Sequence, residues 1–261
     1  MAEPVMLNFG QKVDLCARIR NVLSNYPEGA LLKEMLQNAD DAGASVFEVL
    51  LDLRTHGTES LCLPGTAAFQ GPALLTFNSA VFTDTDLESI QQIGGSKKTG
   101  SKTGRFGVGF CSCYHATDLP SFLSRHFLAI LDPHCKHLPD ASHTDPGKLI
   151  DFLQPGLAER FRDQFAPYRI FGCDLQSSFE GTISRLPLRT EEQAASSRIS
   201  RQPYRAAAEQ LVREFAAALP ELSLFLTHVH TIAVSVWRDG AAVPEVLGRL
   251  EARDAANGHV P

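Results

Sequence analysis

Three polar side chains that could hold a divalent cation and an activated water fall on one stripe of a predicted helix. Glu34, Asn38 and Asp41 stand at positions i, i+4 and i+7 of LLKEMLQNADDAGA, so 3.6 residues per turn place them on one narrow face. This stripe lacks the Lys and Arg of most solvated faces, and the order carboxylate, amide, carboxylate is typical of a site for a divalent cation and an activated water. An ordinary solvated helix face is the alternative. An adjacent, wider apolar face consists of Leu32, Met35, Leu36 and Ala39.

A glycine-rich basic segment has the composition of a phosphate-binding loop. Six of the nineteen glycines fall within residues 94–109, and Lys97 and Lys98 lie among them. The segment runs into GRFGVGF (104–110), where glycines allow backbone N–H groups to approach an anion. The Gly-Lys-Ser/Thr end of a Walker A loop is absent, and no strand precedes the motif as in a Rossmann fingerprint. We expect the basic part, Gly94–Thr103, to act as a lid with lysines for phosphate; a set of tight turns is the alternative.

Cysteine and histidine residues offer a second type of site. The six cysteines are scattered at spacings unlike those of a zinc finger or ribbon, which favours reduced, buried thiols. His134, Cys135 and His137, with His143 further on, could hold a metal ion. A polar surface loop explains this cluster without a ligand, and we favour that interpretation.

These motifs lie among helices and strands that do not alternate regularly. We expect helices over residues 13–25, 29–42, 82–94 and 203–219, a shorter one near 157–164, and a buried helix at FCSCYHA. Strands are expected at 45–53, 73–80, ESLCLPG, LPSFLS, HFLAILD and GTISRLPL, with LSLFLTHV and TIAVSVW following near the C-terminus. Residues 134–178 otherwise read as irregular. This mixture predicts a two-layer α+β domain.

Composition limits the classes of function. Of the 261 residues, 44% are hydrophobic and 21% charged, which is typical of a globular chain with a sizeable core. The formal net charge of −6 has the wrong sign for a protein that coats nucleic acid. Neither a membrane-spanning apolar stretch nor a secretory signal is recognisable, so we expect a cytoplasmic protein without a membrane span or nucleic-acid partner.

The order of the motifs resembles a known family. A helix with E-x-x-x-N-x-x-D, a strand, a lid, G-x-F-G-x-G-F and a late strand opening with Gly-Thr resemble the Bergerat (GHKL) ATP-binding fold of heat-shock protein 90, gyrase B, histidine kinases and MutL. YPEGALLKEMLQNADDAGA, GPALLTFNSAVFTDTDL, TGRFGVGFCSCYHATDLPSFLS, FLAILDPH, QFAPYRIFGC and GTISRLPLRT are similar to the repeated N-terminal modules of sacsin and its relatives. The resemblance covers residues 9–236.

The resemblance implies roles for individual residues. Glu34 corresponds to the general base that polarises the water attacking the γ-phosphate, Asn38 to the amide ligand of Mg²⁺, and Asp41 to the acidic position one turn later. Asn78 and Thr182 correspond to the adenine side. The nucleotide's phosphates are expected to contact Lys97, Lys98, Gly104, Arg105, Phe106, Gly107, Val108, Gly109 and Phe110.

One departure from the family weakens the expected nucleotide contact. FNSAVF stands where the heat-shock and gyrase families have an Asp-x-Gly-x-Gly turn, with Asn78 at the aspartate position and Ala80 and Phe82 at or near the glycines. An amide accepts a hydrogen bond from the adenine amino group without the charge that strengthens it, at about 0.5–1.5 rather than 1.5–3 kcal/mol. Phe82 would also fill part of the nucleotide cavity.

The resemblance therefore predicts a Bergerat-type nucleotide-binding domain over residues 9–237, with a mixed, largely antiparallel sheet covered by helices. It also predicts a polar C-terminal extension over 238–261, truncated from a larger protein. Its expected function is Mg²⁺-dependent ATP binding with slow, weak ATPase activity in a chaperone-type module. The expected cofactors are ATP and Mg²⁺, and the expected partners are neighbouring domains of the longer chain, chaperones or client proteins. A nucleotide-deficient interaction scaffold of the same fold is the alternative.

Overall fold

One eight-stranded sheet, built from strands spread over the chain, organises the protein. The computed structural model describes residues 14–25, 27–91 and 109–251. The strands are β1 (Val46–Asp52), β2 (Ala73–Asn78), β3 (Ser121–Arg125), β4 (Phe127–Leu131), β5 (Gly147–Asp151), β6 (Phe179–Pro187), β7 (Thr231–Trp237) and β8 (Glu245–Glu251). Their spatial order is β5-β4-β3-β6-β2-β1-β7-β8, and all neighbouring pairs are antiparallel except β1 with β7. This mixed, largely antiparallel α+β arrangement is the sheet that the sequence predicts.

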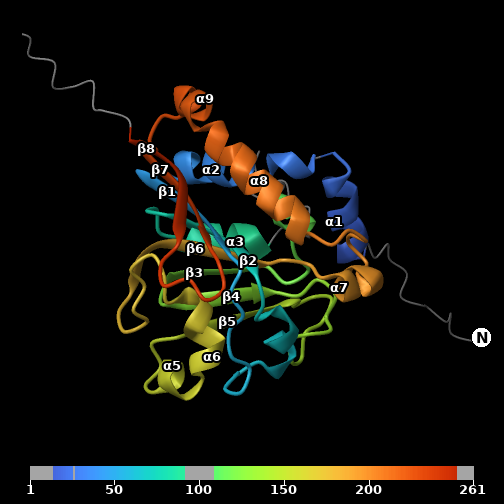
Figure 1. The fold of residues 1–261 in the computed structure, drawn as a ribbon. Coiled ribbons are helices and arrows are strands. Elements are labelled where there is room, and N and C mark those ends of the chain that lie inside the picture. Colours follow the sequence, from blue (N-terminus) through green and yellow to red (C-terminus); the bar gives the residue numbers. More distant parts are fainter. Residues whose placement is uncertain (1–13, 26, 92–108, 252–261) are drawn as a thin grey trace, which may run out of the picture.

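The longer helices cover one face of the sheet. They are α1 (Leu15–Leu23), α2 (Leu31–Asp41) and α8 (Arg205–Ala217), with the short turns η1 (Glu28–Ala30) and η4 (Phe110–His115) packed beside them (Figure 1). Phe47, Val49 and Leu51 of β1 point into this core, as alternation along a strand requires. The buried residues of α2 include Leu32 and Leu36, so the apolar face predicted from the sequence is the face that packs.

Helix α2 ends by a glycine-dependent mechanism. Gly43 adopts a φ of +77°, the left-handed region that costs a glycine little. The N–H of Ala44 then donates to the carbonyl of Ala39, which closes a Schellman-type cap. The chain leaves α2 at this point and enters β1, which positions the Glu34 and Asn38 face of α2 relative to the sheet.

The opposite face of the sheet carries a third layer that the two-layer expectation missed. Short helices and turns cover it: η2 (Pro64–Phe69), α5 (Leu157–Arg160), α6 (Arg162–Phe165) and η5 (Ala166–Tyr168). Leu50 of β1, Leu75 of β2 and Ile183 of β6 point into this second core with Phe69 and Phe165. In Figure 1 this layer lies below the sheet, on the side away from α8. The remaining elements are α3 (Asp84–Gln91), α7 (Glu191–Ser196), α9 (Leu219–Leu222) and η6 (Ser223–Phe225).

The predicted strand at ESLCLPG is wrong. The N–H groups of Glu59 and Ser60 donate to the carboxylate of Asp163, and that of Leu63 to the side-chain oxygen of Gln164. These side chains on α6 take the hydrogen bonds that a neighbouring strand would have taken. Pro64 then begins η2. The segment LSLFLTHV is likewise a 3₁₀ turn followed by a loop, whereas TIAVSVW forms β7.

Two strands were missed in segments that read as polar. β5 lies inside the stretch predicted to be irregular, where it pairs with β4 at the edge of the sheet. β8 lies inside the predicted polar extension, but it pairs with β7 along its length and continues the same sheet. The domain boundary expected at residue 237 therefore falls short, because the sheet runs on to Glu251.

Candidate functional site

Glu34 and Asn38 converge on the start of η4. Both side chains come from one face of α2, and α2 packs against η4 in the core. A Cβ atom built on Gly109 would lie 2.9 Å from Oε2 of Glu34 and 3.7 Å from both terminal atoms of the Asn38 side chain. Only a residue without a side chain fits here without displacing the carboxylate. The structure thus brings together a carboxylate, an amide and a glycine that the sequence separates by some seventy residues.

Asp41 does not join this group. It is exposed, and its Oδ1 accepts a hydrogen bond of 2.8 Å from Nε2 of Gln37 on the same helix. The stripe predicted from helical periodicity therefore divides. Its first two members face η4, and its last member faces solvent at the end of α2.

Several predicted phosphate contacts lie outside the described residues. These are Lys97, Lys98, Gly104, Arg105, Phe106, Gly107 and Val108. Phe110, the next residue after Gly109, is described and half-buried, and it packs at the edge of the core.

Asn78 and Thr182 are directly opposite each other in the β2–β6 ladder. Both are already hydrogen-bonded to Ala80: Oδ1 of Asn78 accepts from its N–H at 3.0 Å, and the hydroxyl of Thr182 donates to its carbonyl at 2.8 Å. The turn after β2 is therefore closed by the two side chains that the sequence assigns to the adenine side. A ligand at this end would have to share or displace these hydrogen bonds.

Ser124 is a member of this group that sequence reasoning missed. Its hydroxyl donates to the carbonyl of Gly181 at 2.6 Å and accepts from the N–H of Phe82 at 3.0 Å. Thr182 lies 3.2 Å from the same oxygen. Nothing local marks a serine near the end of a strand for this role, because its partners come from two other segments.

The ring of Phe82 packs against apolar residues rather than projecting freely. It lies 4.8 Å from the ring of Phe122, centroid to centroid, and Phe110 contacts the same ring from another side at 6.4 Å. Leu87 of α3 joins this small cluster. The aromatic residue expected to fill part of the nucleotide cavity is therefore held on β3, between the closed turn and the start of η4.

A buried carboxylate next to the site fixes α2 to the rest of the fold. Asp40 is 3% exposed and accepts hydrogen bonds from the N–H groups of Thr227, His228 and Val229. Burial alone would raise the pKa of Asp40, but these backbone donors, Val229 foremost, hold it below its usual value. The carboxylate thus joins the C-terminal part of α2 to the segment that leads into β7. The Asp40–Asp41 pair in the sequence does not tell which of the two is buried.

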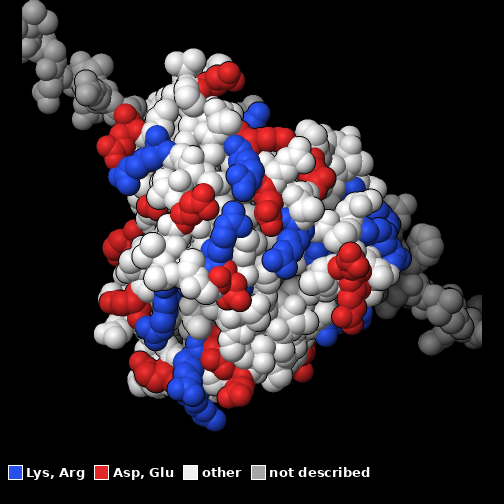
Figure 2. Space-filling view, viewed as in Figure 1, with Lys and Arg blue, Asp and Glu red and all other residues white. Residues whose placement is uncertain are grey.

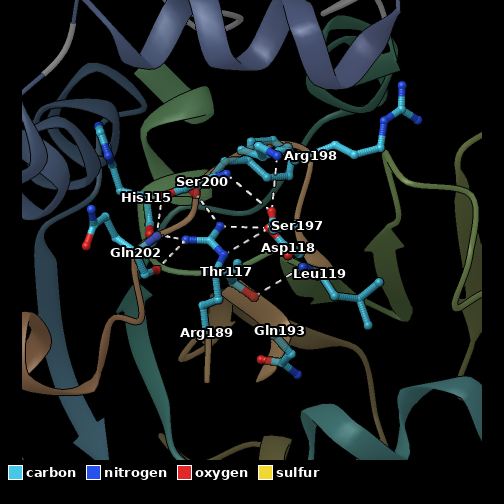
Figure 3. Close-up of polar contacts among 12 residues, drawn as sticks. His115, Thr117, Asp118, Leu119, Arg189, Gln193, Ser197, Arg198, Ser200 and Gln202 are labelled. Carbon is cyan, nitrogen blue, oxygen red and sulfur yellow. Dashed lines mark hydrogen bonds and ion pairs between the residues drawn. The ribbon is translucent and has the colours of Figure 1, made fainter. Parts of the chain in front are cut away.

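A buried arginine braces the other end of η4. Figure 3 shows the Arg189 guanidinium among His115, Asp118, Ser197 and Gln202. It donates to Oδ1 of Asp118 at 2.7 Å and to the carbonyls of Tyr114 and His115, each at 2.7 Å. The hydroxyl of Ser197 donates to the same carboxylate oxygen at 2.9 Å. The segment after Gly109 is thereby joined to the connection between α7 and α8.

The second candidate site, in the His134 loop, takes the form of a structural loop. The described residues hold no group of three or more His, Cys, Asp or Glu side chains placed to bind a metal ion. Nε2 of His134 instead accepts from the N–H of Arg198 at 3.0 Å. Oδ2 of Asp132 accepts from the three backbone N–H groups of residues 136–138. The cysteines are all reduced; four are buried as expected, whereas Cys62 and Cys135 are half-buried.

The comparison with protein families decides what kind of domain this is. The profile of the family described as "Sacsin domain" matches residues 12–248, which is most of the chain. The chain belongs to the sacsin domain family. The match extends into β8, in agreement with the sheet rather than with a boundary at 237.

Human sacsin contains a related sacsin domain. The two are 38% identical over 234 residues, which cover 87% of this chain but 5% of human sacsin. The sacsin domain described here therefore spans about one twentieth of the length of that relative. Among solved structures, the N-terminal domain of a DNA repair protein aligns with 91% of this chain and 56% of its own, at 9% identity and a TM-score of 0.49.

The surface of this sacsin domain carries charges of both signs. Figure 2 shows Lys, Arg, Asp and Glu side chains interspersed over one face, without a broad field of one sign. Within the described ranges, no helix has the length and apolar character needed to cross a bilayer.

Glu34 and Asn38 beside Gly109 are the groups in this sacsin domain that are arranged for chemistry. They offer oxygen ligands for a cation and a carboxylate that could take a proton from water, and the main chain at Gly109 lies close to both.

Proposed function

We propose that this sacsin domain is a Bergerat-type module that binds Mg²⁺-ATP and hydrolyses it slowly. The observation that carries the proposal is the approach of Gly109 to Glu34 and Asn38. A carboxylate and an amide oxygen beside a glycine main chain are the groups that a water molecule, a hard cation and a phosphate require. The order of α2, β1, β2, η4 and β6 supports the assignment of the fold.

Each group has a role in the proposal. Asn38 would supply an oxygen ligand to Mg²⁺, which when bound neutralises phosphate charge. Glu34 would accept a proton from the attacking water. Gly109 would let the N–H groups at the start of η4 come close to the γ-phosphate. These ligands fit the ion, because Mg²⁺ prefers oxygen and both side chains approach the same Cβ position at Gly109.

Two further parts of the proposal are the lid, which lies outside the described residues, and the neighbouring domains of a longer chain. On sequence alone, Gly94–Thr103 would act as the lid and Lys97 and Lys98 would neutralise phosphate charge. The domain covers a small part of its human relative. We infer a chaperone-type role in which nucleotide state is passed to neighbouring domains of a longer chain in the cytoplasm.

The closed turn after β2 favours a second candidate function. The side chains of Asn78 and Thr182 are already hydrogen-bonded to the backbone of Ala80, and Phe82 packs on Phe122. A turn satisfied by its own side chains gains less from a base than an open one. The second candidate is therefore a scaffold of the same fold that binds proteins rather than nucleotide.

Calorimetry with ATP and Mg²⁺, combined with phosphate release, tests the proposal. Glu34→Ala should lower hydrolysis by about 10²–10⁴ and leave ATP affinity within a few-fold, because the carboxylate acts on water. Asn38→Ala should weaken Mg²⁺-ATP binding itself. Lys33→Ala, an exposed change on the same helix, is the control and should behave as the wild type.

Asn78→Asp separates the two candidate functions. A carboxylate would strengthen the contact with an adenine amino group and tighten binding. If the wild type binds no ATP at millimolar concentration and Asn78→Asp does not rescue binding, the nucleotide proposal is wrong and the scaffold takes its place.

A further inference from the structure

A small polar cavity lies in the second core, on the opposite side of the sheet from α2. Gln70, Ser121, Tyr168 and Arg185 line it together with Thr66 and Gln164. Its volume is about 10 Å³, which leaves space for a single water molecule or monatomic ion. Polar side chains converging on so small a space are unusual in a core made mainly of Leu, Ile and Phe.

Arg185 is the charged member of this lining. Its side chain is almost completely buried on β6, at 4% exposure. It donates to the carbonyl of Gly71 at 3.2 Å, whereas its Nε has no partner among the described residues. Burial lowers the pKa of Arg185 from its usual value, although Tyr168 and Asp52 act in the opposite direction.

The nearby carboxylate does not neutralise this arginine. Asp52 is held by Arg54 through two hydrogen bonds of 2.8 Å between the guanidinium and the two carboxylate oxygens. One negative and two positive charges therefore meet on this side of the sheet, and the described part of the chain contains no ion pair to Arg185. An unpaired buried cation is costly unless another group compensates it.

We propose that this cavity binds a single monovalent anion of halide size, held by the Nε–H of Arg185. Such an ion balances the local charge and occupies the donor that the protein leaves without a partner. The volume excludes phosphate and carboxylate ligands, so the site is separate from the Glu34–Asn38 site and independent of the function proposed for it.

Gln70 completes the site. Its side chain is 3% exposed, and its Oε1 has no hydrogen-bond partner among the described residues. A half-turn of the terminal amide replaces this oxygen with an NH₂ group and presents a second donor to the cavity. The hydroxyls of Ser121 and Tyr168 lie 2.6 Å apart, and Ser121 donates to the carbonyl of Arg185. These hydroxyls are thus engaged with each other and with the backbone of β6.

Thermal unfolding at constant ionic strength tests the site, with chloride and bromide as probes and gluconate as the counter-anion too large to enter. Binding to the folded state alone should raise Tm saturably, by about 2–4 °C when the halide is at roughly five times its Kd. Bromide anomalous scattering from a crystal should place one ion beside Nε of Arg185. Arg249→Met, which removes an exposed arginine, is the control and should keep the response.

Two variants distinguish the ion from a general salt effect. Gln70→Glu places a carboxylate in the cavity, so its Tm in gluconate should rise and its response to halide should disappear. Arg185→Met removes the buried charge and should also abolish the response. Equal Tm values in chloride and gluconate, or an unchanged halide response in folded Gln70→Glu, would show that the cavity holds only water and overturn the proposal.

Discussion

At the scale of single residues, Gly109 shows how a missing side chain can define a site. Its φ of −60° is ordinary for any residue, so conformational freedom is not the reason for a glycine here. The reason is space, because a Cβ would meet the carboxylate of Glu34 at 2.9 Å. The obstructing atom is the end of a flexible side chain, which can rotate away.

Gly109→Ala should therefore spare the fold and damage the site. We expect the free energy of unfolding to change by no more than about 1 kcal/mol, because alanine suits this backbone conformation and Glu34 can move. The displaced carboxylate should lower hydrolysis at least tenfold under the proposed function. Gly29→Ala is the matched control, since no atom lies within 4 Å of its Cβ position. Equal activity in the two variants would contradict the close approach; chemical unfolding and phosphate release are the measurements.

At the scale of elements, the connection between α7 and α8 is fixed by buried polar contacts. Arg189 joins it to η4 through Asp118 and Ser197, as Figure 3 shows. On its other side, the His134 loop reaches the same connection at Arg198. This connection is thus held by Arg189, by Asp118 just after η4 and by His134 from the loop after β4.

Arg189→Met should destabilise the protein strongly. The guanidinium is fully buried, and its loss leaves Asp118 and two backbone carbonyls without their donor. Breaking a buried pair in this way costs about 3–5 kcal/mol. Arg249→Met breaks an exposed pair with Glu251 and should cost no more than about 1 kcal/mol. Urea unfolding of both variants gives the comparison, and similar midpoints would contradict the role of Arg189.

The His134 contact should make stability depend on pH. Burial, followed by the charges of His137 and Arg198, lowers the pKa of His134, against the opposite effects of Asp118 and Asp132. The folded chain then binds fewer protons than the unfolded one, so this contribution is complete above about pH 6.5 and is lost as the pH falls through the lowered value.

The corresponding variant is His134→Gln, whose side-chain oxygen can still accept from Arg198 without titrating. Its free energy of unfolding should fall less steeply between about pH 7.5 and 5.5 than that of the wild type. His143→Gln, an exposed change, should retain the wild-type slope. Identical slopes for His134→Gln and the wild type would show that this imidazole does not titrate with folding.

At the scale of the whole molecule, the sheet joins its first strand along the chain to its last two. β7, near the C-terminal end, inserts in parallel beside β1, and β8 covers its outer edge. Leu247 and Leu250 of β8 pack on the core beneath α8. The last strand therefore belongs to the domain in hydrogen bonding and in packing.

A chain ending at residue 242 should be less stable than one ending at residue 251, which keeps the whole of β8. Removal of β8 exposes the ladder edge of β7 and part of the helix-side core, and an open edge favours association with other chains. Thermal melting and light scattering should show a lower Tm and aggregation for the shorter chain only. Equal melting of the two chains would mean that β8 adds nothing to the fold.

Patterns within one segment could be recognised from the sequence by itself. The amphipathic α2, the apolar strands β1, β2, β6 and β7, and the clustering of glycines before η4 each depend on spacing along a short stretch. The mixed, largely antiparallel sheet followed from these elements and from the family resemblance. The pairing of Glu34 with Asn38 on one helix face followed from helical periodicity alone.

Only the tertiary structure decided which polar groups are satisfied and by what. Asp40 rather than Asp41 is buried because its hydrogen-bond donors lie 187–189 residues away. Glu59, Ser60 and Leu63 do not form a strand because α6 takes their hydrogen bonds. The closed turn at Ala80 and the cavity at Arg185 likewise depend on distant segments. Local spacing carries no information about such partners. A buried polar group needs a hydrogen bond, and the segment that provides it is set by the whole fold.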